Sequence, residues 1–110
     1  MAAFVAWLQA QEWAVQREVA FCDVVARRDG VTLYAEAKGR TTSPGLDVDT
    51  LYGQLLRRVP LDAVGARFGV VVPSQARAAA LRVPDSVRRL LDITVYVVDA
   101  AGYVEEIAPA

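Results

Sequence analysis

The chain has 110 residues and a mass of 11.9 kDa, so we expect residues 1–110 to form one domain with its own core. Histidine is absent, which excludes Ser-His-Asp and Cys-His nucleophile systems, histidine zinc sites and histidine general bases. The 12 basic and 13 acidic residues nearly cancel, so the overall charge does not indicate a nucleic-acid partner.

Cysteine content and hydropathy favour a cytoplasmic protein. Cys22 is the only cysteine, which excludes an intrachain disulfide, and the N-terminus has no signal-peptide pattern. No stretch of about eighteen apolar residues predicts a membrane span. Hydrophobic residues make up 55% of the chain and the mean hydropathy is +0.27, which leaves room for an apolar surface covered by a partner subunit. Eleven of the 12 basic residues are arginines, and Lys38 is the only lysine.

The first predicted elements are a short helix and a strand. Residues 3–11 favour a helix, because Phe4, Val5 and Leu8 recur at helical spacing. From Trp13 onward apolar and polar residues alternate, which predicts a strand. A helix that continues to Arg17 is the alternative.

A β-hairpin is predicted next. The β-rich runs 20–28 and 31–38 flank Asp29-Gly30, a dipeptide typical of two-residue turns because both positions need a positive φ.

A polar loop over 40–45 then leads into a helix from about 49 to 59. Asp47 or Asp49 would cap this helix, and Pro60 would end it. Its apolar stripe consists of Leu51, Leu55 and Val59.

The remaining sequence predicts two buried strands, two helices and a final short strand. In chain order these are a strand over 67–72, a helix from its Ser74 cap to 82, a helix from Pro84-Asp85 to 91, a strand over 93–98, a turn at 100–102 and a strand over 103–107. The fold class is therefore α/β, with a central mixed β-sheet flanked by α-helices.

The hairpin register determines which side chains share a face. A two-residue turn at Asp29-Gly30 places Asp23 opposite Glu36 and Phe21 opposite Lys38, all on one face. The other face is apolar and is expected to be core; it carries Cys22, Val24 and Ala26 opposite Leu33, Ala35 and Ala37.

Two opposed carboxylates repel each other, so this face needs a raised pKa, a salt bridge or a shared cation. Lys38 relieves the repulsion between Asp23 and Glu36 only in part. Mg²⁺ would do so more fully, since it binds one or two carboxylates together with phosphate and water, and the Ala37 carbonyl could add an oxygen. The alternative is a solvated salt-bridge cluster on an ordinary strand face.

Asp23, followed after twelve residues by Glu36-Ala37-Lys38-Gly39, resembles the core of the PD-(D/E)xK nuclease superfamily, which has a restriction-endonuclease-like fold. The resemblance implies that Asp23 and Glu36 bind Mg²⁺ or Mn²⁺ and that Lys38 positions the attacking water. It also implies a catalytic role for Gln54 on the following helix, whose alternative is a surface glutamine. An early acidic residue is used in some branches, and either Glu12 or Glu18 could supply it.

The sequence departs from the family pattern at two positions. Cys22 stands where a proline often precedes the acid, and Arg58 follows Gln54 where the RecB-like branch has a tyrosine.

The resulting hypothesis is a metal-dependent deoxyribonuclease that hydrolyses DNA phosphodiester bonds. Arg40, Arg57 and Arg58 are the first candidates for DNA contacts, with the pairs Arg27-Arg28 and Arg88-Arg89 behind them. The alternatives are a catalytically silent module that binds nucleic acid or a partner protein, and a subunit of a larger DNA-processing complex.

A homodimer is expected, because cutting both strands needs two centres. Its candidate contacts are the strand over 93–98 and the helix from Asp85. For that strand, plain core is the alternative.

Overall fold

The computed structural model describes residues 1–19, 22–39, 43–58 and 63–109. These residues form one six-stranded sheet in the order β1-β2-β3-β4-β5-β6. The strands are β1 (Ala14–Val19), β2 (Cys22–Arg28), β3 (Val31–Ala37), β4 (Ala66–Pro73), β5 (Ile93–Val98) and β6 (Val104–Ile107). β3, β4 and β5 are parallel to one another, whereas β1-β2, β2-β3 and β5-β6 pair in antiparallel fashion. The predicted mixed sheet is confirmed.

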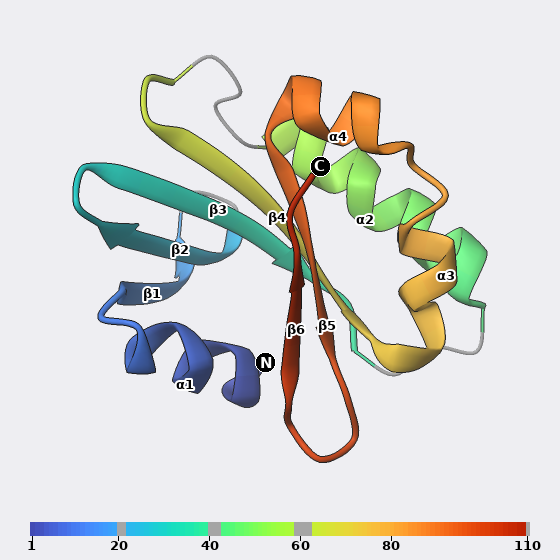
Figure 1. Ribbon diagram of the computed structural model, residues 1–110, viewed down its shortest axis with the longest axis horizontal. Helices are drawn as coiled ribbons and strands as arrows, with labels where there is room; N and C mark the ends of the chain where they lie inside the picture. Colours follow the sequence, from blue (N-terminus) through green and yellow to red (C-terminus); the bar gives the residue numbers. More distant parts are fainter. Residues whose placement is uncertain (20–21, 40–42, 59–62, 110) are drawn as a thin grey trace.

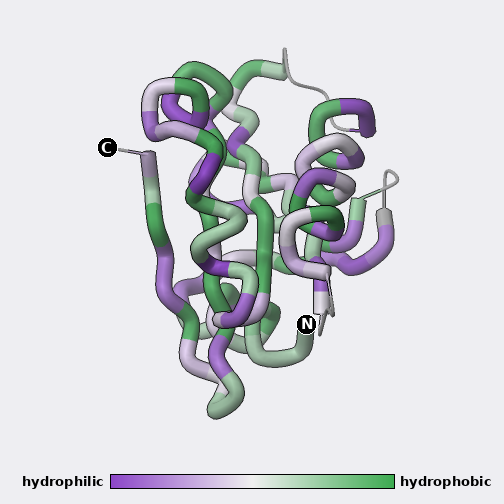
Figure 2. The backbone as a smooth tube through the Cα atoms, turned by 90° about the vertical axis from the view of Figure 1, so that its right-hand side faces the viewer, coloured by the Kyte–Doolittle hydropathy of each residue, from purple (hydrophilic) through white to green (hydrophobic). Residues whose placement is uncertain are grey.

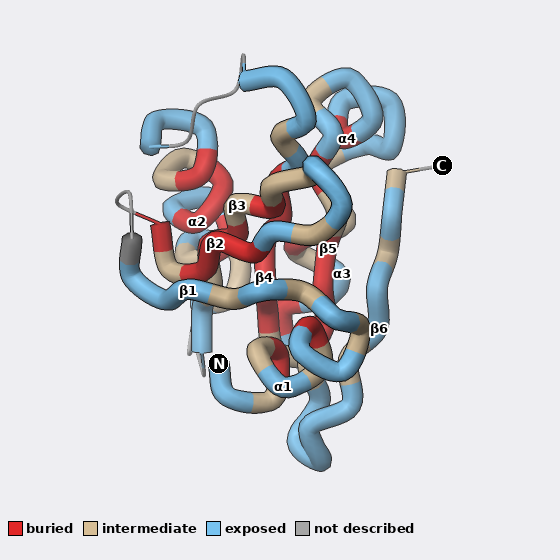
Figure 3. The backbone as a smooth tube through the Cα atoms, turned by 90° about the vertical axis from the view of Figure 1, so that its left-hand side faces the viewer, coloured by how far each residue is buried: buried red, intermediate tan, exposed pale blue. Residues whose placement is uncertain are grey.

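Helices cover both faces of this sheet (Figure 1). On one face lies α1 (Ala2–Ala10), and on the other lie α2 (Pro44–Arg58), the 3₁₀ turn η1 (Ser74–Ala76), α3 (Arg77–Ala80) and α4 (Asp85–Leu91). Along the helices the tube alternates between hydrophobic and hydrophilic residues (Figure 2), as in amphipathic helices that pack on a core. The central strands carry most of the buried residues, and β1 and β6 are largely exposed (Figure 3). No helix of the described residues is long and apolar enough to cross a membrane.

Each face of the sheet has its own core. Phe4 and Leu8 of α1 pack on Val24, Ala26, Leu33, Ala35, Val71 and Tyr96. Val48, Leu51, Tyr52 and Leu55 of α2 pack on the opposite face, against Val25, Phe68, Val70, Val72, Ile93, Val95 and Val97. A strand with buried residues on both faces reads as a continuous apolar run, and β4 and β5 have that pattern.

The predicted hairpin is confirmed in detail. Asp29 and Gly30 have φ values of 52° and 79°, the positive pair that a two-residue turn requires. Val24 pairs with Ala35, and Val25 pairs with Tyr34, in the register set by this turn.

One residue of the hairpin lies on the face opposite to the predicted one. Cys22 packs with Val25 in the core under α2, whereas Val24 packs in the core under α1. The alternation of faces breaks at Asp23, beyond the last regular pair of the β2-β3 ladder. Glu18, on the neighbouring strand, has a left-handed φ of 55°, which distorts β1 at the same level.

The structure decides two predictions about where elements begin. The predicted strand after Trp13 is confirmed as β1, so the alternative of a helix to Arg17 is wrong. α2 begins at Pro44, so Asp47 and Asp49 lie inside it and do not cap it. Proline suits the first helical turn because its missing N–H needs no partner there. Val59 and Pro60, predicted to end this helix, lie outside the described residues.

The region after β4 differs in two further ways. Ser74 does not cap a helix but begins η1, with Pro73 preceding it in an extended conformation. The strand β5 pairs with both β4 and β6, so it is core and has no free edge for a dimer contact. Val87 and Leu90 of α4 remain exposed.

Candidate functional site

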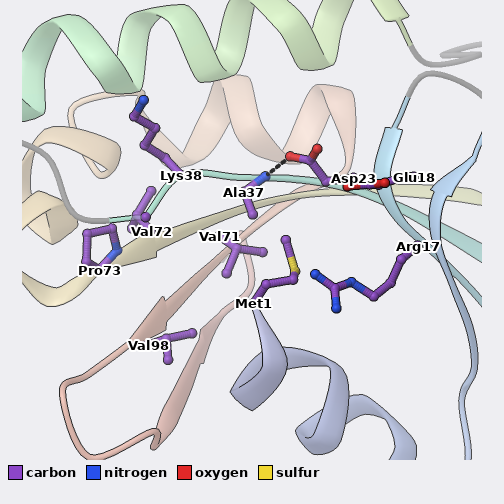
Figure 4. Close-up of a pocket in the computed structure, with 11 residues that line it drawn as sticks. Met1, Arg17, Glu18, Asp23, Ala37, Lys38, Val71, Val72, Pro73 and Val98 are labelled. Atoms are coloured by element: carbon purple, nitrogen blue, oxygen red, sulfur yellow. Dashed lines mark hydrogen bonds between the residues drawn. The ribbon is translucent and has the colours of Figure 1, made fainter.

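The predicted carboxylates lie together where the β2-β3 ladder ends. The carboxylate of Asp23 accepts a hydrogen bond of 2.8 Å from the backbone N–H of Ala37 (Figure 4). This hydrogen bond to a side chain replaces the next backbone pair that would extend the β2-β3 ladder. Glu36, the residue before Ala37, is only 1% exposed. The local fold thus brings one half-buried and one fully buried carboxylate to the same corner of the sheet.

Glu36 lies in an unfavourable setting for an isolated negative charge. Burial, followed by the hydrogen bond and the charge of Asp23, raises the pKa of Glu36 to about 7, and Arg58 opposes this rise. Oε1 of Glu36 is buried and has no hydrogen-bond partner among the described residues. A buried oxygen of this kind needs a proton or a cation, so the pair has the chemistry of a small oxygen-ligand metal site.

A cavity of about 360 Å³ opens beside Asp23. Its charged lining comes from three elements: Arg17 and Glu18 of β1, Asp23 of β2, and Lys38 directly after β3. The rest of its lining is mainly apolar and consists of Met1, Val71, Val72, Pro73 and Val98, together with Ala37 and Gly39.

A second cavity of about 440 Å³ lies on the α2 side of the same corner. It is lined by Glu18, Cys22, Asp23 and Arg58. Because Glu18 and Asp23 line both cavities, the two hollows meet at these carboxylates. Burial and the nearby charge of Glu36 raise the pKa of the Cys22 thiol to about 11, so this cysteine is not a thiolate nucleophile at neutral pH.

Lys38 is exposed and lines the first cavity, and its backbone N–H donates to the Val71 carbonyl at 2.9 Å. Its side chain extends away from Asp23 in Figure 4, toward α2. The lysine therefore lines the candidate cavity, but its ammonium is turned away from Asp23, one of the two carboxylates that it is predicted to accompany.

The predicted residues on α2 divide into two groups. Arg58 lines the second cavity and acts electrostatically on Glu36. Gln54 is half-buried and Arg57 donates to the Gly53 carbonyl at 3.2 Å; neither lines the two cavities. Arg40 lies outside the described residues.

The other arginine pairs are held elsewhere. Arg27 donates to the Gln16 side chain at 3.0 Å, and Arg28 donates to the Gln11 carbonyl at 2.9 Å while lying over the ring of Trp13. Arg88 is buried and bonds to Asp85 and the Val83 carbonyl, so it is a structural residue of α4.

Between the two candidates for the early acid, the geometry favours Glu18. Glu18 lines both cavities with Asp23, whereas Glu12 follows α1 and lines neither. Arg17 is a site residue that the sequence reasoning missed. Pairing the predicted strand from Trp13 with the next strand in antiparallel fashion would have placed positions 17 and 18 beside Asp23.

Within the described residues, no group of three or more histidine, cysteine, aspartate or glutamate side chains converges to hold a metal ion. A pair of carboxylates is nevertheless sufficient for Mg²⁺, which completes its shell with water and substrate oxygens. The open oxygen of Glu36 and the adjacent Asp23 fit such an ion.

No protein-family model and no curated protein sequence matches the chain. Crystal structures of other proteins share its fold, among them these two. One is an XisH family protein from Nostoc punctiforme PCC 73102, with a TM-score of 0.62 and 15% identity over 91% of each chain. The other is a fdxN element excision controlling factor protein from Anabaena variabilis, with a TM-score of 0.62 and 16% identity over 91% of each chain. At these identities the likeness establishes the fold.

Proposed function

We propose that the protein is a metal-dependent deoxyribonuclease with a PD-(D/E)xK site. The observation that carries the proposal is the buried Oε1 of Glu36, which has no partner among the described residues and lies behind Asp23. Asp23 lines the first cavity together with Lys38, whereas Glu36 itself lines neither cavity. A purely structural strand end has no need for two coupled carboxylates with an open oxygen. The structural neighbour described as a fdxN element excision controlling factor supports a role in DNA processing.

Asp23 and Glu36 would hold Mg²⁺ or Mn²⁺, with the carbonyl of Ala37 as a further candidate ligand. When bound, the ion lowers the pKa of water and offsets charge on a phosphate. Hydrolysis breaks one P–O ester bond, with water adding to the phosphorus and a proton passing to the departing oxygen.

The side chains around the carboxylates supply positive charge for the phosphate. Lys38 is exposed on a long flexible side chain, so its ammonium can turn toward a phosphate or water in the first cavity. Arg58 in the second cavity and Arg17 in the first attract the flanking phosphates. These local cations provide the electrostatic attraction that the chain's net charge of −1 lacks.

A catalytically silent module that binds DNA or a partner protein is the second candidate. The observation in its favour is the side chain of Lys38, which is directed away from Asp23. The nuclease should cleave DNA when a metal ion is present, whereas the silent module should not.

The test is incubation with plasmid, nicked and branched DNA in Mg²⁺ or Mn²⁺. We expect cleavage by the parent protein and a loss on the order of a hundredfold or more in Lys38→Ala, because a positioned cation is removed from the transition state. Arg27→Ala is the control, since this exposed arginine lies at the other end of β2 from Asp23. Equal cutting by Lys38→Ala and its parent would refute the role of Lys38. Absence of cutting, together with no metal uptake that depends on Asp23, would favour the silent module.

A further inference from the structure

The first cavity, beside Asp23, has two chemically different sides. Arg17, Glu18, Asp23 and Lys38 provide charge, whereas Met1, Val71, Val72, Pro73 and Val98 form an apolar side. In Figure 4 the side chains of Met1, Val71 and Val98 lie below the Asp23–Ala37 hydrogen bond, on the side nearer α1. We call Met1, Val71, Val72, Pro73 and Val98 together the apolar wall.

Continuous duplex DNA does not need such a wall. Its bases are stacked inside the helix, and it presents phosphate and sugar to a site that contacts the backbone. A nucleotide taken out of the stack exposes the face of its base, which is complementary to an apolar surface. The apolar wall adjoins the carboxylates and therefore lies where the sugar and base next to a bound phosphate would be placed.

The size of the cavity agrees with one nucleotide. Its volume of about 360 Å³ lies at the lower end of the range of small-molecule sites, roughly 300–1,000 Å³. Burying a large part of a base against five apolar side chains would be favourable by about 25 cal/mol per Å² of apolar surface.

The second cavity provides a path for the rest of the strand. It shares Glu18 and Asp23 with the first and carries Arg58 on its α2 side. A strand that places one base against the apolar wall can pass its neighbouring phosphate over the carboxylates toward Arg58.

From these observations we propose that the first cavity, beside Asp23, takes one unpaired nucleotide of a DNA strand, so that the protein acts on single-stranded or frayed DNA in preference to continuous duplex. This inference rests on the proposed nuclease function and specifies its substrate class.

The test compares binding of a fluorescein-labelled oligonucleotide, single-stranded or annealed into a blunt duplex, in Ca²⁺. We expect the single strand to bind about tenfold more tightly than the duplex, from contact of one base with the apolar wall. Val98→Trp fills the cavity and should remove most of this difference. Val64→Trp is the matched control, because Val64 is fully exposed and lies before β4, at the other end of that strand from the cavity.

Val98→Thr keeps the shape of the side chain at this half-buried strand end, so it serves if the tryptophan variant does not fold. We expect a several-fold weaker affinity for the single strand in Val98→Thr, with duplex binding unchanged. Equal affinity of the parent for both DNA forms, or an unchanged preference in both Val98 variants, would overturn the inference.

Cleavage assays on the same DNAs separate the two proposals. Cutting without a single-strand preference rejects only the inference, and a Val98-dependent preference without metal-dependent cutting rejects only the nuclease activity.

Discussion

Glu36→Gln tests the electrostatic state of the site through protein stability. The amide keeps the shape of the carboxyl group but removes its titration. Burial and Asp23 raise the pKa of Glu36 from 4.5 to about 7 in the folded protein, so the folded state holds its proton more tightly than the unfolded chain does. Stability from this group is therefore fully present below pH 4.5 and is lost as the pH rises through about 7.

The size of the effect follows from the interval between the two pKa values. At about 1.4 kcal/mol per pH unit, the interval from 4.5 to about 7 corresponds to roughly 3 kcal/mol. Part of this change falls below pH 5, so we expect a loss of about 2–3 kcal/mol between pH 5 and pH 8. The Glu36→Gln variant should lack this component, and it should be more stable than the parent at pH 8.

The assay is urea unfolding followed by the fluorescence of Trp7 and Trp13, with EDTA present, at several values between pH 5 and pH 8. Subtracting the free energy of unfolding of Glu36→Gln from that of the parent cancels the titration of groups distant from Glu36 and leaves that of Glu36 with its partner Asp23. Glu105→Gln is the control, because the ion pair with Arg77 lowers the pKa of Glu105 and its exposed carboxylate contributes in the opposite direction. A parent-minus-variant difference that does not change between pH 5 and pH 8 would refute the reasoning.

The remaining predictions concern neighbours of this group and the core beneath it. Arg58→Ala should raise the pKa of Glu36 further, and Asp23→Asn should lower it toward its ordinary value, because the charges of Arg58 and Asp23 act on Glu36 in opposite directions. ¹³C NMR titration of the Glu36 carboxyl measures the pKa in both variants. Shifts of the same sign would contradict the arrangement. Arg58→Ala should also weaken DNA binding and reduce its salt dependence by about one unit of slope, measured by anisotropy across a salt series. Gly69→Ala should destabilise the fold by about 1–3 kcal/mol, measured by urea unfolding. The new Cβ of the alanine would lie 2.7 Å from Cε2 of Tyr96, whose ring already packs against Phe4. An unchanged stability would mean that the Tyr96 ring can move aside.

The hairpin and its acidic pair could be predicted because local rules determine them. The Asp29-Gly30 turn fixes the register as far as Val24 opposite Ala35, which brings Asp23 and Glu36 to the same corner although they do not form a regular ladder pair. The order of strands and helices followed from apolar periodicity in the same way. These parts of the fold depend on residues that are near one another in sequence.

What could not be predicted depends on contacts made in three dimensions. The burial of Glu36 arises from packing in the complete sheet, and no alternation pattern distinguishes it from an exposed strand residue. The left-handed Glu18 is not a glycine, so its backbone conformation, and the change of face at Cys22, had no sequence signal. For α2, Pro44 and Gly45 were interpreted as loop residues, although the same dipeptide is acceptable in a first helical turn.

Diffraction from a crystal of the protein soaked in Mn²⁺ tests the central claim most directly. The account predicts an anomalous difference peak within ligand distance of both Asp23 and Glu36, and the loss of that peak in Asp23→Asn. A parent crystal with saturating Mn²⁺ and no peak between these two carboxylates would contradict the metal-dependent nuclease.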